Sequence, residues 1–194
     1  MSTHKNIPIF TASSRQEWRD WLDKNHEIEK SVWLLIHKKE SGIPSVYYPE
    51  AVDEALCFGW IDSVANKNDE KSYLQYFAKR KSTSNWSAVN KLKVEKLIAE
   101  GLMTEAGMKM IDLAKKTGTW NALDKVDQLV IPDDLFYKLN TNQQAKANFE
   151  NFASSAKRGI LEWILNAKKP ETRQKRIDIT VEKAAENIKA NFPG

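Results

Sequence analysis

The sequence predicts an α+β fold, with a small, mainly antiparallel sheet and helices in the N-terminal half and a helical C-terminal half packed against it. Two patterns predict this class. Residues 31–38 and 73–78 are apolar on both alternating faces, as buried strands are, and such runs stop after the first half. From residue 103 onward the apolar residues recur at helical spacing, and the clearest stripe runs from Ile177 to Phe192.

The change of pattern places a boundary near residue 101. The length of 194 residues allows one large domain or two small ones. We therefore expect an α+β unit over residues 1–100 and a helical unit over residues 101–194, either separate or built around one shared core.

The composition is that of a soluble globular protein, with 41% hydrophobic and 29% charged residues. The single cysteine, Cys57, excludes an internal disulfide and a cysteine-rich metal site. No apolar run is long enough to span a bilayer, and the start of the chain lacks an apolar stretch of signal-peptide length. We therefore expect a cytoplasmic protein without a membrane span.

The first elements are a helix and a strand. Ser14 and Glu17 form a capping box, and Trp18 and Trp21 follow on one helical face. This helix is expected to end near His26, and the first buried strand begins at residue 31.

A second helix and two further strands are expected next. Pro49 suits the first turn of a helix, because its missing N–H has no partner to lose there. Gly59 can end that helix, because glycine accepts the left-handed conformation common just past a helix. Strands are then expected at residues 60–65 and 73–78.

A polar loop over residues 82–85 leads into the next helix, which Ser84 can cap. This helix is expected to stop near Gly101 and to carry the apolar residues Val89, Leu92, Val94, Leu97 and Ile98. In the second half the connection over residues 121–131 lacks periodicity. Helices are expected to begin at Met103, Pro132 and Pro170, and two further helices are expected to be capped by Thr141 and Ser155.

The first segment with candidate site residues follows Gly59, where Trp60 and Asp62 share one strand face. One interpretation makes Trp60 a core residue and Asp62 a strand-edge residue. The other makes Asp62 a site carboxylate beside Cys57. A free cysteine is usually a small buried hydrophobe, and no neighbour argues for a lowered thiol pKa, so we do not expect Cys57 to be a nucleophile.

The second segment is a basic loop that leads into a helix start. Arg80 can bind a phosphate or carboxylate through two N–H groups, and Ser84, Trp86 and Asn90 surround the helix start, where free backbone amides favour anions. The alternative is an ordinary capped helix with a solvated loop. The glycines of a nucleotide-binding loop are missing, so ATP is not indicated and no cofactor is expected.

The third segment opens the last helix. Arg173 precedes Ile177 by four residues and therefore sits beside the buried stripe, whereas Arg176 is freer. A guanidinium at that margin needs an anionic neighbour, because an isolated buried charge is costly. We expect Asp62 to be this neighbour.

These three segments resemble the YdeI/OmpD-associated family, which is also described as bacteriocin-protection proteins. The matching pieces are EAVDEALCFGWIDS at 50–63, RKSTSNWS at 80–87 with Asn90, AKKPETRQKRI at 167–177, and shorter stretches at 100–103 and 118–120. The resemblance implies protection against bacteriocins or cationic antimicrobial peptides and an association with an outer-membrane porin. It brings no catalytic residues.

Three functions are compatible with these observations. The leading hypothesis is a cytoplasmic, non-catalytic stress or resistance protein that binds an anionic ligand or a protein partner. The second is an enzyme acting on a small anionic substrate, with Asp62 as acid or base. The third is weak, non-specific nucleic-acid binding through residues 79–81, Lys91 and Lys93, helped by Trp86. The evenly spread net charge of +4 gives it little support. In the first two cases we expect Trp60, Asp62, Arg80, Trp86 and Arg173 to meet in one cleft, without a metal.

Overall fold

The computed structural model describes residues 3–4 and 6–191. The chain divides into two compact units, Met1–Asn121 and Ala122–Gly194, and each contains its own cluster of buried apolar side chains.

The boundary between the units lies after Asn121 rather than near residue 101. The cause is the helix α4 (Glu105–Thr117), whose Ile111 and Ala114 are buried in the core of the first unit. Helical periodicity shows that α4 has an apolar face, but it does not show which core that face enters.

The first unit contains a sheet, whose described strands follow the order β1-β2-β3-β5-β4. Strand β2 runs parallel to β3, and the other neighbouring pairs are antiparallel, which confirms the predicted fold class. Strand β2 was not predicted, because it is short and contains a proline. The strands are β1 (Thr3–His4), β2 (Ile7–Thr11), β3 (Ser31–His37), β4 (Trp60–Lys67) and β5 (Ser72–Lys79).

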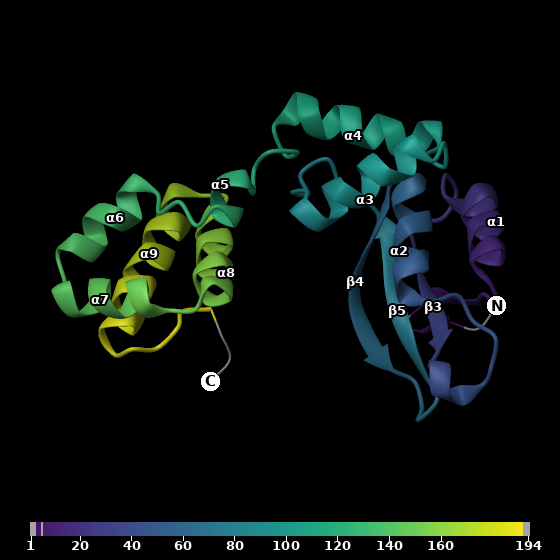
Figure 1. Cartoon of the computed structure of the whole chain (residues 1–194), viewed down its shortest axis with the longest axis horizontal. Coiled ribbons are helices and arrows are strands. Elements are labelled where there is room, and N and C mark those ends of the chain that lie inside the picture. The colour runs from purple at the N-terminus through teal and green to yellow at the C-terminus, as the bar shows by residue number, and fades with distance from the viewer. Residues whose placement is uncertain (1–2, 5, 192–194) are drawn as a thin grey trace. The chain divides into compact units, whose positions relative to one another are not determined.

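Helix α2 is the central helix of this unit, since it contacts α1, β4, α3 and α4 (Figure 1). Half of the predicted capping box exists, because the Ser14 side chain accepts a hydrogen bond from the backbone N–H of Glu17 at 3.2 Å. The Glu17 carboxylate accepts from the backbone N–H of Ser13 at 2.7 Å, instead of from that of Ser14. Besides α4, the helices are α1 (Arg15–Asn25), the short 3₁₀ helix η1 (Lys39–Ser41), α2 (Tyr48–Cys57) and α3 (Ala88–Ala99).

Stacked aromatic rings fill the space between α1 and the sheet. The Trp18 ring lies 5.2 Å from Trp21 and 5.3 Å from Phe77, measured between centroids. Phe10 lies 5.4 Å from Trp21. The buried indole N–H of Trp18 donates to the backbone oxygen of Ala51 at 3.0 Å, so this ring also fixes α1 against α2.

Close backbone contact joins α2 to α4. A Cβ added at Gly107 would lie 2.3 Å from the carbonyl oxygen of Cys57, so only glycine fits there. The Thr104 hydroxyl donates to the same Cys57 oxygen at 2.6 Å. Together these contacts place the start of α4 at the end of α2.

The carboxylate of Glu54 is the main buried charge of α2, with 2% of the residue exposed. It accepts from Arg15 Nε at 2.6 Å and from Arg19 Nη1 at 2.5 Å. Arg19 Nη2 also donates to the backbone oxygen of Leu102 at 2.8 Å. This Glu54 cluster, meaning Glu54 with Arg15 and Arg19, therefore links α1, α2 and the segment before α4.

The apolar residues expected on α3 divide between the core and the surface. Val94 and Leu97 are buried, whereas Val89 and Leu92 are 63% and 66% exposed. Apolar residues occur around most of α3, so periodicity did not identify the side that enters the core.

The second unit is helical, and strands are absent from the described residues after Lys79, as predicted. Helix α9 is central and contacts α6, α7 and α8 (Figure 1). Phe192, predicted at the end of its apolar stripe, lies outside the described residues. The helices are α5 (Asp124–Asp127), α6 (Asp133–Asn140), α7 (Gln143–Asn151), α8 (Ser154–Leu165) and α9 (Pro170–Ala185).

Two of the predicted helix caps in this unit are displaced. The Asn142 side chain, rather than Thr141, accepts from the backbone N–H of Ala145 at the start of α7. Ala153, not Ser155, occupies the N-cap position of α8 and makes no side-chain bond there. Among the described residues, no helix is long and apolar enough to cross a membrane.

The Glu54 cluster gives a stability test. Glu54→Gln keeps the volume but leaves Arg15 and Arg19 without their anionic partner. It should lower the free energy of unfolding of the first unit by about 3 kcal/mol, the lower end for buried pairs, since both arginines keep some access to water. Urea unfolding followed by tryptophan fluorescence measures this change, because every tryptophan except Trp163 lies in the first unit.

The exposed Glu95 on α3 provides the matched control, and Glu95→Gln should change stability by less than about 0.5 kcal/mol. Equal effects of the two substitutions would contradict a structural role for the Glu54 cluster.

Candidate anion-binding site

Arg80 follows β5, and its positively charged side chain is buried in the first unit. Its backbone N–H donates to the oxygen of Gly59 at 3.0 Å, which fixes the residue beside the start of β4. Its side chain is buried, with only 6% of the residue exposed. The guanidinium lies over the ring of Trp86 at 3.8 Å from the centroid, and Nη2 donates to the backbone oxygen of Asn85 at 2.5 Å.

The other two nitrogens of this guanidinium, Nε and Nη1, are buried and have no hydrogen-bond partner among the described residues. Burial lowers the pKa of Arg80 to about 10, while the charge of Asp62 acts in the opposite direction. Arg80 therefore stays charged at neutral pH. Three of its five N–H bonds belong to these two nitrogens, so most of its donor capacity is unused.

Arg80 also lines a pocket of about 520 Å³ at the junction of β4, β5 and α4. Lys79, Lys109 and His26 line the same pocket, and Glu27 is the acidic residue among its lining side chains. Lys79 Nζ donates to the backbone oxygen of Glu27 at 2.8 Å. Lys109 pairs with Glu105 at 2.7 Å, so Arg80 and Lys79 are the cations of the pocket that have no ion pair among the described residues. These two charges, against that of Glu27, favour an anion.

Trp60 lines this pocket but is almost wholly buried, with 1% exposed. Its indole N–H donates to the backbone oxygen of His26 at 3.3 Å. Trp60 is therefore a core residue that also borders the pocket.

Asp62 finds a partner that was not predicted. The Tyr48 hydroxyl donates to Asp62 Oδ2 at 2.7 Å. Burial and the Asp62 carboxylate together raise the pKa of Tyr48 to about 12. The pairing of β4 with β5 shifts register between Asp62 and Ala65, so Asp62 lies beside an irregularity of the strand.

The helix start near Arg80 is capped by a different serine from the one predicted. The Ser87 side chain, not that of Ser84, accepts from the backbone N–H of Asn90 at 3.3 Å. Ser84 instead belongs to a turn, where its N–H donates to the oxygen of Lys81 at 3.0 Å. The loop continues three residues beyond Ser84 before the backbone becomes helical, which the run of polar residues did not reveal.

Arg173 also has a partner that was not predicted. Its Nε and Nη2 donate to Asp134 Oδ2 and Oδ1 at 2.6 and 2.9 Å, and these bonds hold the pKa of Asp134 below its usual value. The expected pairing with Asp62 is therefore not the one that the structure has, because each residue is bonded within its own unit. Arg176 donates to the backbone oxygen of Trp163 and lies 5.1 Å from the centroid of its ring.

Cys57 is a buried thiol, as expected for a free cysteine in a core. Burial, reinforced by the charge of Glu54, raises its pKa to about 11, although Arg19 acts in the opposite direction. The thiol is therefore protonated at neutral pH. Among the described residues, no group of three or more His, Cys, Asp or Glu side chains is placed to hold a metal ion.

Tyr48, Glu54 and Asp134 were not predicted as partners. Glu54 carried a usable signal, because a carboxylate between Ala51 and Ala55 on an apolar helix face requires a cation nearby. Tyr48 and Asp134 carried none, since a residue in the first turn of a helix is ordinarily solvated.

Family comparisons separate the two units. Residues 10–110, more than half of the chain, match a family model described as a domain of unknown function, DUF8412. The chain belongs to this family. Residues 128–187 match a second model, described as Bacteriocin-protection, YdeI or OmpD-Associated, which confirms the predicted resemblance for the second unit. The predicted motifs at 50–63 and 80–87 lie in the part that matches DUF8412 instead.

Two other comparisons gave no matches. Neither a curated protein nor a solved structure matches the chain significantly.

The raised pKa of Cys57 predicts an inert thiol. Alkylation by iodoacetamide near neutral pH should be slow in the folded protein and fast after unfolding in urea, as mass spectrometry would show. The folded thiol stays protonated up to its pKa of about 11, whereas the ordinary value is 9.0. Folding stability should therefore fall as the pH rises from 9 toward 11. Rapid, complete alkylation of the folded protein would contradict this description of Cys57.

Proposed function

We propose that the first unit binds a small anion at Arg80, and that the chain acts as a cytoplasmic, non-catalytic protein of the bacteriocin-protection type. The observation that carries this proposal is the buried guanidinium of Arg80, whose Nε and Nη1 have no hydrogen-bond partner among the described residues.

The free energy of an unpaired buried charge supports an anionic ligand. Leaving a buried charged donor without a partner costs several kcal/mol relative to a satisfied one. Glu54, the other deeply buried charge of this unit, has ion-pair partners on both of its oxygens. A phosphate or carboxylate that accepted from Arg80 would remove the same cost at Arg80.

The surroundings of Arg80 favour an anion over a neutral ligand. Lys79 and Lys109 line the same pocket, and the ring of Trp86 holds the guanidinium in place from one face. A cation fixed by stacking loses less conformational freedom on binding than a mobile lysine does. The carboxylate of Glu27 also lines the pocket and would repel an anionic ligand placed close to it.

Two observations support a role without catalysis. The thiol of Cys57 is buried and protonated at neutral pH. Asp62, the candidate acid or base, accepts a hydrogen bond from Tyr48, whose own pKa of about 12 keeps its hydroxyl protonated at neutral pH. A role in protection against bacteriocins rests on the description of the family that residues 128–187 match, and a porin partner rests on the same description.

Arg80→Met separates binding from structure. Methionine fills much of the same volume and removes the buried charge, so the ligand-free melting temperature should stay within a few degrees of that of the original protein. The loss of the contact with Trp86 costs about 0.5–2 kcal/mol, which the removal of an unpaired buried charge offsets. The stabilisation by added phosphate, sulfate or citrate should disappear. Differential scanning fluorimetry at constant ionic strength measures both effects.

Lys81→Met is the matched control, since it removes the same charge from an exposed neighbour. It should leave the response to the three anions unchanged. The proposal is wrong if none of these anions, nor a panel of nucleotides and sugar phosphates, stabilises the original protein more than Arg80→Met.

A further inference from the structure

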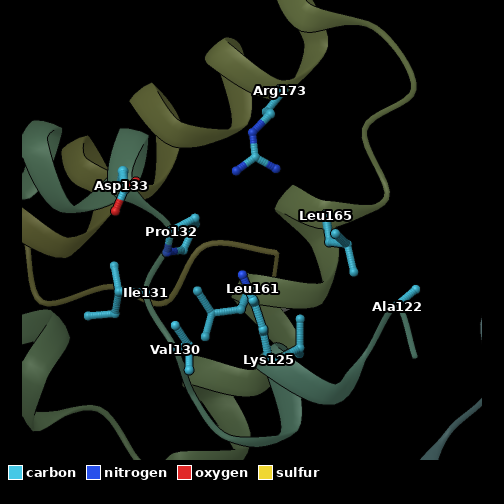
Figure 2. Close-up of a pocket in the computed structure, with 10 residues that line it drawn as sticks. Ala122, Lys125, Val130, Ile131, Pro132, Asp133, Leu161, Leu165 and Arg173 are labelled. Carbon is cyan, nitrogen blue, oxygen red and sulfur yellow. The ribbon is translucent and has the colours of Figure 1, made fainter. Parts of the chain in front are cut away.

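We propose that the second unit binds a small monocarboxylate with an apolar body, in a cavity of about 270 Å³ lined by α5, α6, α8 and α9. The cavity lies within residues 122–173, and Figure 2 shows the side chains around it. This proposal concerns a different unit and a different arginine from those of the proposed function, so each can fail without the other.

The wall of the cavity is largely apolar. Val130, Ile131 and Pro132 form one side, from the connection between α5 and α6. Leu161 and Leu165 on α8 form another. Val130 and Leu165 keep 46% and 38% of their surface exposed, so a ligand with an apolar body would cover surface that the unit leaves in contact with water.

Arg173 supplies the first positive charge. Figure 2 shows its guanidinium projecting from α9 toward Pro132 and Leu161. Asp134 holds Nε and Nη2, so the orientation of the guanidinium is fixed. Nη1 makes only a long contact of 3.5 Å with the backbone oxygen of Ile164. The N–H groups of Nη1 are therefore the ones available to a ligand.

The balance of charges favours a single carboxylate. Lys125 on α5 lines the cavity together with Arg173, and Asp133 is the acidic lining residue. Asp134 already neutralises part of the charge of Arg173. Two cations against two carboxylates leave little net attraction for a dianion, whereas one carboxylate can sit between Lys125 and Nη1 of Arg173.

The volume limits the size of the ligand. At about 30 Å³ for each water-sized group, the cavity holds roughly nine non-hydrogen atoms. A branched aliphatic acid of about this size fits. An apolar amino acid also fits, and its ammonium group can donate a hydrogen bond to the Asp133 carboxylate. Both share the chemistry proposed here, an apolar body with one carboxylate.

Isothermal titration calorimetry on the full chain tests this proposal with isocaproate, leucine, acetate and isohexanol. Isocaproate or leucine should bind at least about tenfold more tightly than acetate, which lacks the apolar body, or isohexanol, which lacks the charge. Tighter binding of isocaproate identifies a free acid as the ligand class. Tighter binding of leucine identifies an amino acid held also by Asp133.

Substitutions at the exposed edge of the cavity keep the fold intact. Val130→Asp should abolish the binding, and Lys125→Ala should weaken it by about fivefold, as for a partly solvated charge. Ile188→Asp is the matched control for the first, because Ile188 is 48% exposed, and Lys189→Ala is the control for the second. Neither control should change the affinity.

Two results would overturn the proposal. One is the absence of binding by both isocaproate and leucine. The other is equal affinity of the bound acid for the original protein and for Val130→Asp, which would place the binding elsewhere.

Discussion

The buried carboxylate of Glu54 holds the helical layer of the first unit together. It fixes α1 to α2 through Arg15 and Arg19, and Arg19 extends the link to the backbone before α4. The close packing of Gly107 on Cys57 depends on the same placement of α2. A charge can be buried here only because both of its oxygens have cationic partners, since an isolated carboxylate would cost far more than its packing contributes.

Arg80 is a buried charge of the same unit that lacks a full set of partners. This contrast with Glu54 is the basis of the functional proposal. Its depth of burial is similar to that of Glu54, at 6% against 2% exposed, yet Nε and Nη1 have no partner among the described residues. Both oxygens of Glu54 are paired in the same unit, so packing alone does not explain the unpaired N–H groups of Arg80. An anionic ligand would complete the pairing, and the pocket lined by Lys79 and Lys109 offers it a basic environment.

The sequence predicted the class of the fold and the kinds of residue in the site, but not the pairings. Central strands and capped helices follow from local patterns, so residues 31–38 and Ser14 were interpreted correctly. Which side chains meet depends on how elements far apart in the sequence pack. Asp62 and Arg173 each required a partner, as expected, and received Tyr48 and Asp134 instead. Local patterns also failed where apolar residues surround a helix, as at α3.

The most direct test of the account is to observe the Arg80 guanidinium itself. In protein labelled with ¹⁵N-arginine, the Nε–Hε signal of Arg80, assigned by its loss in Arg80→Met, can be followed by NMR during a titration with phosphate. The account predicts a saturable shift of this signal and slower exchange of its proton with water, because Nε–H gains a charged acceptor. A signal that stays unchanged while phosphate shifts the signals of other arginines would contradict it.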